Sequence, residues 1–126
     1  MKIWARQEIV KKLKEWDESI ISAEEIWVWA SDEWTPYADE YRDKEYDVDG
    51  VFQSVSRDVI HHLEELARLD IVREDIPSLL EYLNTPLGEY REGNRLFNEY
   101  FDSIDWELRN QELKHQKPYS YWERRN

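Results

Sequence analysis

Residues 51–69 of the chain read VFQSVSRDVIHHLEELARL, and this stretch decides the fold. Apolar residues recur in it at intervals of three and four, the spacing that gathers side chains on one face of an α-helix. No glycine or proline interrupts the pattern. We therefore predict a central core helix over 51–69, with a buried stripe formed by Phe52, Val55, Val59, Leu63, Leu66 and Leu69.

Three further segments carry the same kind of pattern. An amphipathic helix is predicted over residues 2–16, with an apolar stripe that reaches Ile20 and lysines on the other face. A short helix is predicted over 76–83, where Pro77 fits the first turn. A last long helix is predicted over 89–113, with an apolar face formed by Leu96, Phe97, Tyr100, Phe101, Ile104 and Leu108.

Residues 23–33 are predicted to form a fifth helix with a capped start. Ser22 and Glu25 have the spacing of a capping box, in which each side chain accepts a hydrogen bond from the other residue's backbone N–H. The alternation over 26–29 also fits a short strand, but no hairpin turn signal follows it. Thr35–Pro36 predicts the end of this helix, because the residue before a proline avoids the α region.

These patterns together predict an all-α fold. We expect a single domain over 1–126, a helical bundle of about five helices with an acidic, aromatic-rich loop segment and an extended C-terminal tail over 117–126. The absence of cysteine excludes disulfides and thiolate chemistry. The N-terminus is charged too early for a signal peptide, and no apolar run approaches the roughly 20 residues that span a bilayer. We therefore expect a soluble, cytoplasmic protein.

Most of the excess charge lies in residues 17–50, which we call the acidic segment. It contains twelve carboxylates and two basic residues, so it carries −10 of the net −12 of the chain. Such a charge disfavours nucleic acids and anionic membranes as partners and favours a basic protein. Six large aromatic residues are interleaved with the carboxylates: Trp27, Trp29, Trp34, Tyr37, Tyr41 and Tyr46.

The tryptophans of the acidic segment point in different directions on the predicted helix. Trp27 and Trp34 are seven residues apart and share a face, whereas Trp29 is turned well away from both. The three rings cannot all be buried against one neighbour. Either at least one faces a partner, or the segment folds back and buries all three. Trp16 and Trp106 are expected in the core.

No catalytic, metal or cofactor motif stands out. His61 and His62, with Glu64 and Glu65, could suggest a metal site, but adjacent histidines diverge by about 100° on a helix, so we expect them to pack and hydrogen bond rather than share a metal. Acidic residues alternate over 43–49, but the glycine and flanking helices of a calcium-binding loop are missing. No serine stands in a Gly-x-Ser-x-Gly turn. With 29 acidic residues, carboxylate pairs are expected by coincidence, and we predict a protein that is not an enzyme and has no cofactor.

A local likeness adds to this interpretation. The string over 69–83, LDIVREDIPSLLEYL, places an acidic-Ile-Pro helix start before a leucine-rich turn and follows a long amphipathic helix. In a small, acidic, cysteine-free chain rich in tryptophan, it resembles the helical immunity proteins of bacterial toxin systems, including contact-dependent growth inhibition and polymorphic or colicin-type toxins. The resemblance implies binding to the toxic domain of a cognate effector, often a nuclease, and inhibition of its active site. It carries over no functional residue.

The predicted contact surface combines aromatic anchors with a complement of charge, because anchors contribute binding energy and charge speeds association. Two other classes of function are also compatible with the sequence: a nucleic-acid mimic that inhibits a DNA-binding protein, and a small helical enzyme or ligand-binding domain. The residues predicted to contact the partner are Trp29, Asp32, Glu33, Trp34, Tyr37, Asp39, Glu40, Tyr41, Asp43 and Tyr46.

Overall fold

The computed structural model describes residues 2–3, 6–37, 41–42 and 53–121. It confirms an all-α single domain, with seven α-helices in these described ranges instead of about five. The helices are α1 (Arg6–Asp17), α2 (Ala23–Tyr37), α4 (Val55–Glu64), α5 (Leu66–Leu69), α6 (Ile76–Leu83), α7 (Tyr90–Asp102) and α8 (Trp106–Leu113). Two 3₁₀ turns, η1 (Arg73–Asp75) and η2 (Tyr119–Tyr121), and a two-residue parallel pairing of β1 (Lys2–Ile3) with β2 (Tyr41–Arg42) complete the described elements.

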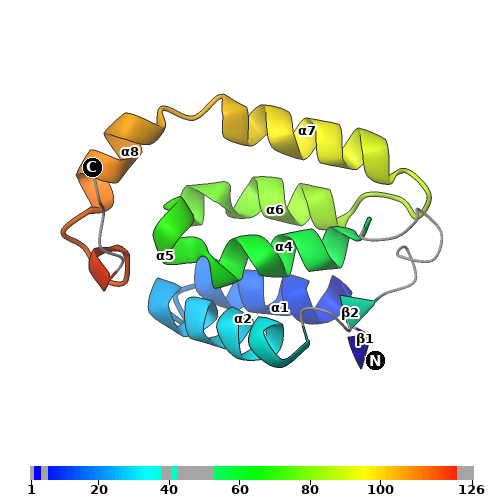
Figure 1. Ribbon diagram of the computed structural model, residues 1–126, viewed down its shortest axis with the longest axis horizontal. Coiled ribbons are helices and arrows are strands. Elements are labelled where there is room, and N and C mark those ends of the chain that lie inside the picture. The colour runs from blue at the N-terminus through cyan, green and yellow to red at the C-terminus, as the bar shows by residue number, and fades with distance from the viewer. Residues whose placement is uncertain (1, 4–5, 38–40, 43–52, 122–126) are drawn as a thin grey trace.

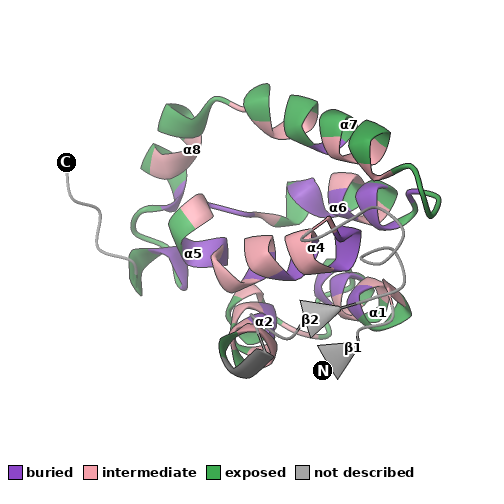
Figure 2. Cartoon of the chain, turned by 45° about the vertical axis from the view of Figure 1, so that its right-hand side comes forward, coloured by how far each residue is buried: buried purple, intermediate pink, exposed green. Residues whose placement is uncertain are grey.

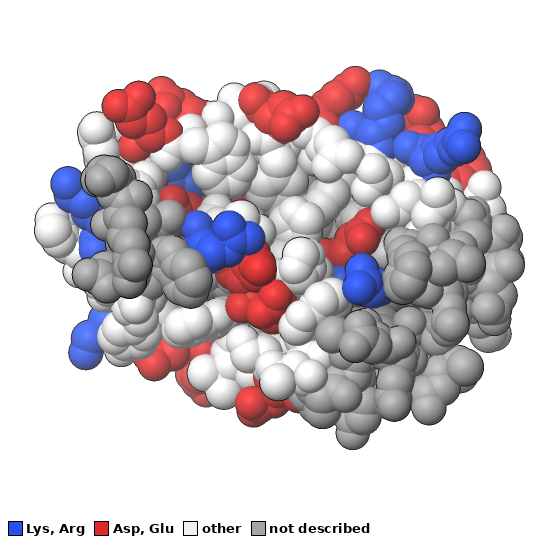
Figure 3. Space-filling model, viewed as in Figure 1, with Lys and Arg blue, Asp and Glu red and all other residues white. Residues whose placement is uncertain are grey.

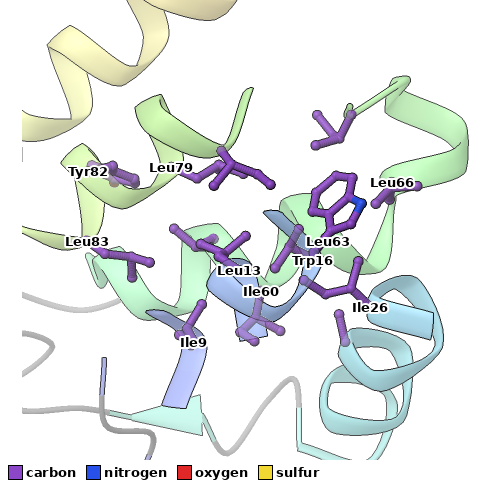
Figure 4. Close-up of a cluster of buried hydrophobic side chains, with 14 of the residues drawn as sticks. Ile9, Leu13, Trp16, Ile26, Ile60, Leu63, Leu66, Leu79, Tyr82 and Leu83 are labelled. Atoms are coloured by element: carbon purple, nitrogen blue, oxygen red, sulfur yellow. The ribbon is translucent and has the colours of Figure 1, made fainter. Parts of the chain in front are cut away.

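The helices form layers that run in similar directions. In Figure 1, α1 and α2 lie along one edge, α4 and α6 form the middle, and α7 lies along the opposite edge. The core lies between α1, α4 and α6 and is closed by α2, as the close-up in Figure 4 shows. Buried residues accordingly gather on the inward sides of the middle helices (Figure 2). The largest fully buried side chains are Ile9, Leu13, Trp16, Ile26, Val55, Ile60, Leu63, Leu66, Ile71, Ile76 and Leu79.

The predicted central helix is present but divided. It begins at Val55, because the Ser54 hydroxyl accepts a hydrogen bond from the Arg57 backbone N–H at 3.1 Å and caps the helix. Glu65 leaves helical geometry, with φ −102° and ψ 17°, and separates α4 from α5. The chain then turns at Asp70, which has a φ of 56°. The predicted stripe positions Val55, Val59, Leu63 and Leu66 are buried, Leu69 is half-buried, and Phe52 lies outside the described residues.

The predicted helix over 89–113 is also divided, because Asp105 starts a new helix. Its carboxylate accepts from the Leu108 backbone N–H at 3.0 Å, which caps α8 and breaks the apolar face. Phe97 is buried as predicted, but Leu96 is 45% exposed and Leu108 52% exposed. Trp106, expected in the core, is 36% exposed and lies over the Phe101 ring.

Both ends of the chain differ from expectation. The first helix begins at Arg6 rather than at residue 2, and it ends at Asp17 before a positive-φ turn at Ser19. Ile20 therefore leaves the apolar stripe and is 63% exposed. At the other end, residues 119–121 form η2 instead of an extended tail, since Tyr119 is buried and donates its hydroxyl hydrogen to the Ile71 carbonyl. Residues 122–126 lie outside the described part.

The second helix continues past Thr35–Pro36 to Tyr37, where the sequence predicted an end. A proline in the last turn removes only one backbone hydrogen bond, so packing of the preceding turn can outweigh that loss. Among the described helices, none has the length and apolar character needed to cross a lipid bilayer.

Gly93 allows α7 to approach the turn after α6. A Cβ atom at this position would lie 2.6 Å from Thr85 Cγ2 and closer still to Thr85 Oγ1. Alanine normally stabilises an exposed helix position relative to glycine by about 0.5–1 kcal/mol. We predict the opposite here: Gly93→Ala lowers the free energy of unfolding by about 1–3 kcal/mol in urea titrations. Thr85→Gly in the same background should recover part of this loss, and a stabilised Gly93→Ala variant would contradict the close approach.

Candidate functional site

The acidic segment is attached to the domain through α2. Ser22 and Glu25 form the predicted capping box, with both reciprocal hydrogen bonds at 3.1 Å. Along the helix, Ile26 and Ala30 are fully buried against the core. The inward side of α2 is therefore fixed by a cap and an apolar contact, and this fixes which side chains remain outside.

Trp27 and Trp34 lie against α4. The Trp27 indole donates to the Glu64 carbonyl at 2.8 Å. The Trp34 ring stacks on His61 with 4.7 Å between centroids and an interplanar angle of 28°, and the Arg57 guanidinium lies 4.9 Å from the Trp34 centroid. Both rings thus fill the contact between α2 and α4, which holds the last turns of α2 in place.

Trp29 lies on the other flank, towards α1. The Lys12 ammonium is 5.7 Å from its ring centroid, within range of a cation–π contact. The prediction that the three tryptophans cannot share one neighbour is confirmed, since two contact α4 and one contacts α1. All three are half-buried and pack against the core, which lies between the two alternatives of a ring facing a partner and of complete burial.

The outward side of α2 has a different character. Five exposed residues follow one another at helical spacing along it, and α2 contains no lysine or arginine. Val28 is 49% exposed and has acidic neighbours four residues away on either side, Glu24 and Asp32. The space-filling view shows acidic groups along the α2 edge of the molecule (Figure 3). We call the exposed residues Glu24, Glu25, Val28, Asp32 and Thr35 the outer α2 face.

The structure separates the predicted contact residues into two groups. Of those on α2, Asp32 is exposed, while Trp29, Glu33 and Trp34 are half-buried beside α1 and α4. Sequence reasoning missed Glu24 and Val28, although their four-residue spacing from each other and from Asp32 was readable. The side chains of Tyr37 and Tyr41, and the whole of Asp39, Glu40, Asp43 and Tyr46, lie outside the described residues.

A second acidic edge, on α7, is largely neutralised by its own arginine. Arg95 pairs with Glu92 and with Glu99, each at 2.5 Å. Figure 3 shows basic and acidic groups side by side on this edge, which lies opposite α2. The outer α2 face has no such internal counter-charge, so its field extends further towards a partner.

The part-buried carboxylate of Asp58 joins three helices. Its Oδ2 accepts from the hydroxyls of Tyr82 at 2.5 Å and Tyr90 at 2.6 Å, and Asn94 Nδ2 lies 3.4 Å away. Burial, followed by the Asp58 charge, raises the pKa of Tyr82; burial and the hydrogen bond to Asp58 raise that of Tyr90. These groups act as neutral donors that hold α6 and α7 on α4.

The fully buried Asp75 joins the C-terminal third of the chain in the same way. Its carboxylate accepts from Tyr100 at 2.5 Å, from Arg109 at 2.8 Å and from the Val72 backbone N–H at 2.9 Å. Burial and the contact with Asp75 raise the pKa of Tyr100. Asp58 and Asp75 are thus each held by donors from other elements, which accounts for them as structural groups.

The two histidine rings diverge, as their adjacent positions on the helix predicted. Their ring planes differ by 84° and their centroids are 6.4 Å apart. His62 packs against the Phe97 and Phe101 rings, and its Nδ1 lies 2.8 Å from the Asp58 carbonyl. Burial lowers the pKa of His62, so it serves the core as a neutral ring.

A groove of about 770 Å³ lies between the α1–α2 turn and α8. Its lining is mixed: Trp16 and Tyr119 contribute apolar surface, and Arg73 and Arg109 contribute charge. Both arginines already have protein acceptors, since Arg109 binds Asp75 and Arg73 donates to the Asp17 carbonyl. The guanidinium groups that line the groove are therefore already bound within the protein, which reduces the charge available to a small ligand.

No family model, no curated protein and no solved structure matches this chain.

Trp34 holds α2 on α4, so its removal should affect folding before it affects any partner. We predict that Trp34→Ala lowers the free energy of unfolding by about 2 kcal/mol, because the stacked His61 and the Arg57 contact are lost. Val28→Ala, on the outer α2 face, should change it by less than about 0.5 kcal/mol. Urea unfolding followed by circular dichroism measures both, and equal stability of the two variants would contradict the assignment of Trp34 to the interior contact.

The raised pKa of Tyr82 predicts a loss of stability at high pH. Above pH 10 the unfolded chain ionises this hydroxyl while the folded chain keeps its proton, so the unfolded state gains stability as the pH rises. Tyr82→Phe removes this pH-dependent contribution and also the hydrogen bonds of the hydroxyl with Asp58 and Asn94. The stability difference between wild type and Tyr82→Phe should therefore shrink by about 1.4 kcal/mol per pH unit above 10. The exposed Tyr121→Phe variant is the control and should show no such change; a constant difference for Tyr82→Phe would refute the assignment.

Proposed function

We propose that this chain is a cytoplasmic, non-catalytic immunity protein that binds a basic toxin domain, most simply a nuclease, and inhibits it stoichiometrically. The observation that supports this proposal is the outer α2 face. Carboxylates surround an exposed Val28 there, and the helix beneath them is held on the core by three tryptophans. The proposal agrees with the resemblance of residues 69–83 to helical immunity proteins.

The charge of this surface suits a basic partner. The acidic segment carries −10 of the net −12, and α2 adds no basic residue to offset its carboxylates. A nuclease must itself be basic where it binds phosphates. Complementary charge raises association rates from about 10⁵–10⁶ to 10⁸–10⁹ M⁻¹s⁻¹ at low salt, which suits a protein that must act before its toxin does.

The shape of the surface suits binding without large rearrangement. The three tryptophans fix α2 from both flanks, so the outer face is presented by a helix whose position is already determined. Little conformational entropy is then lost on association, which favours affinity. Val28 provides an apolar centre that becomes buried on binding, with charges around it as in the rim of many interfaces.

The assignment of the interior polar groups favours binding over catalysis. Asp58 and Asp75 each receive several hydrogen bonds from tyrosine, arginine or backbone donors. General acid–base chemistry needs a carboxyl group that reaches a substrate proton and has a pKa close to the working pH. Both carboxylates instead serve as joints between helices.

Capture with the chain as bait tests the proposal. We expect a basic protein whose isolated C-terminal domain cleaves nucleic acid, and cleavage should stop at one molar equivalent of this chain. The captured domain is expressed alone and assayed with and without the chain. Cleavage that persists at excess chain would contradict the immunity role, and capture of an intact DNA-binding protein without nuclease activity would favour the nucleic-acid mimic instead.

Charge variants test where the partner binds. Glu24→Gln combined with Asp32→Asn should slow association with the captured domain by about tenfold at low salt, with a difference that disappears at high salt. The matched control, Asp102→Asn combined with Glu107→Gln, removes the same charge from the α7–α8 edge and also includes one first-turn glutamate. Stopped-flow kinetics at several salt concentrations measure both. Equal slowing by the two variants would assign the effect to net charge alone.

A further inference from the structure

Three side chains that can bind a metal ion converge at the C-terminal end of α4. His61 Nε2 lies 3.6 Å from Glu64 Oε1 and 3.7 Å from Glu65 Oε1, and the three atoms all lie within 4.8 Å of one another. Glu64 and Glu65 stand three and four residues after His61, so each of them can reach the His61 ring along the helix surface. All three are half-buried, which leaves one side of the cluster accessible to solvent.

The two distances from His61 are close to the ligand spacing of a tetrahedral zinc site, and the oxygens of Glu64 and Glu65 lie within 4.8 Å of each other. Zinc binds histidine nitrogen at about 2.0–2.1 Å and carboxylate oxygen at about 2.0–2.2 Å, which places ligand atoms about 3.4 Å apart. The two distances from His61 therefore need to shorten by only a few tenths of an ångström. Because one histidine and two carboxylates supply three ligands, a fourth position remains for water or for a group from another molecule.

The surrounding contacts hold these side chains in place. The Trp34 ring stacks on the His61 ring and limits its rotation. Arg68 donates to Glu65 Oε2, so the other oxygen, Oε1, is the one directed to His61. The Glu64 carbonyl is held by the Trp27 indole. Trp34 therefore limits the motion of one candidate ligand, whereas the Arg68 ion pair directs Glu65 Oε1 to His61 but competes with a cation for the carboxylate.

We propose that His61, Glu64 and Glu65 form a binding site for a single zinc-class divalent cation. The site differs from the His61–His62 pair, whose rings diverge, and it goes beyond the proposed function because it needs no protein partner. Arg57 and Arg68 lie nearby and oppose a cation by charge, while the two carboxylates favour it. Figure 3 shows this alternation of charge across the middle of the molecule, over α4 and α5.

Titration of the tag-free protein with Zn²⁺ in a calorimeter tests the site. We expect saturation at one ion per chain, and a loss of at least about tenfold in affinity in both His61→Ala and Glu64→Gln. The exposed His115→Ala is the control and should bind as wild type does. Co²⁺ in place of Zn²⁺ should give the strong visible absorption of a tetrahedral complex in wild type and His115→Ala only. Circular dichroism establishes that each variant is folded.

A variant of the neighbouring arginine distinguishes a metal site from a purely structural cluster. Arg68→Gln removes a positive charge and the competing ion pair to Glu65, so it should strengthen Zn²⁺ binding severalfold. If the three residues formed only a structural cluster, Arg68→Gln would remove the ion pair without increasing the affinity for Zn²⁺. The proposal is overturned by the absence of saturable binding. It is also overturned if His61→Ala binds as tightly as wild type, which would assign the ion to the carboxylates of residues 38–50 or to adventitious binding.

Discussion

The packing of α2 on α4 determines what this molecule presents to solvent. Ile26 and Ala30 of α2 are buried in the core, and Trp27 and Trp34 extend the contact along α4. Once those positions are inside, helical geometry leaves Glu24, Glu25 and Asp32 outside. The same packing orients the His61 ring through Trp34, so the acidic face and the histidine cluster both depend on one helix–helix contact.

Two carboxylates add polar contacts to the apolar packing of the C-terminal half of the chain. Asp58 holds Tyr82 and Tyr90, and Asp75 holds Tyr100 and Arg109. These contacts involve residues of α6, α7 and α8, and the outward sides of these helices are polar or exposed to solvent. Carboxylates therefore have two roles. Asp58 and Asp75 accept hydrogen bonds from other elements and join them. Glu24, Glu25 and Asp32 face water on α2, a helix that contains no lysine or arginine.

The sequence predicted the elements better than their ends. The stripe over 51–69 and the Ser22–Glu25 capping box were readable because they depend on residues close in sequence. The breaks at Glu65 and before Asp105 were missed. The break before α8 has a local signal, because the Asp105 carboxylate caps the new helix, whereas nothing in the apolar spacing marks the departure of Glu65 from helical geometry.

The candidate site shows the same limit. Helical spacing correctly predicted that Trp27 and Trp34 share a neighbour and that Trp29 faces another, but the identity of those neighbours, α4 and α1, is a tertiary property. All four predicted aromatic anchors were expected to face a partner, whereas the two whose side chains are described, Trp29 and Trp34, hold α2 in place. The sequence places Glu64 and Glu65 beside the two histidines, but the divergence of adjacent histidines argued against a metal site there. That both carboxylates reach His61 is visible only in the structure.

The central claim is that a basic partner covers the outer α2 face. Carboxyl footprinting, in which exposed Asp and Glu side chains are labelled with and without the captured partner and read by mass spectrometry, tests it directly. The account predicts that Glu24 and Asp32 lose label in the complex while Asp102 and Glu107 keep theirs. Undiminished labelling of Glu24 and Asp32 in a saturated complex would contradict it.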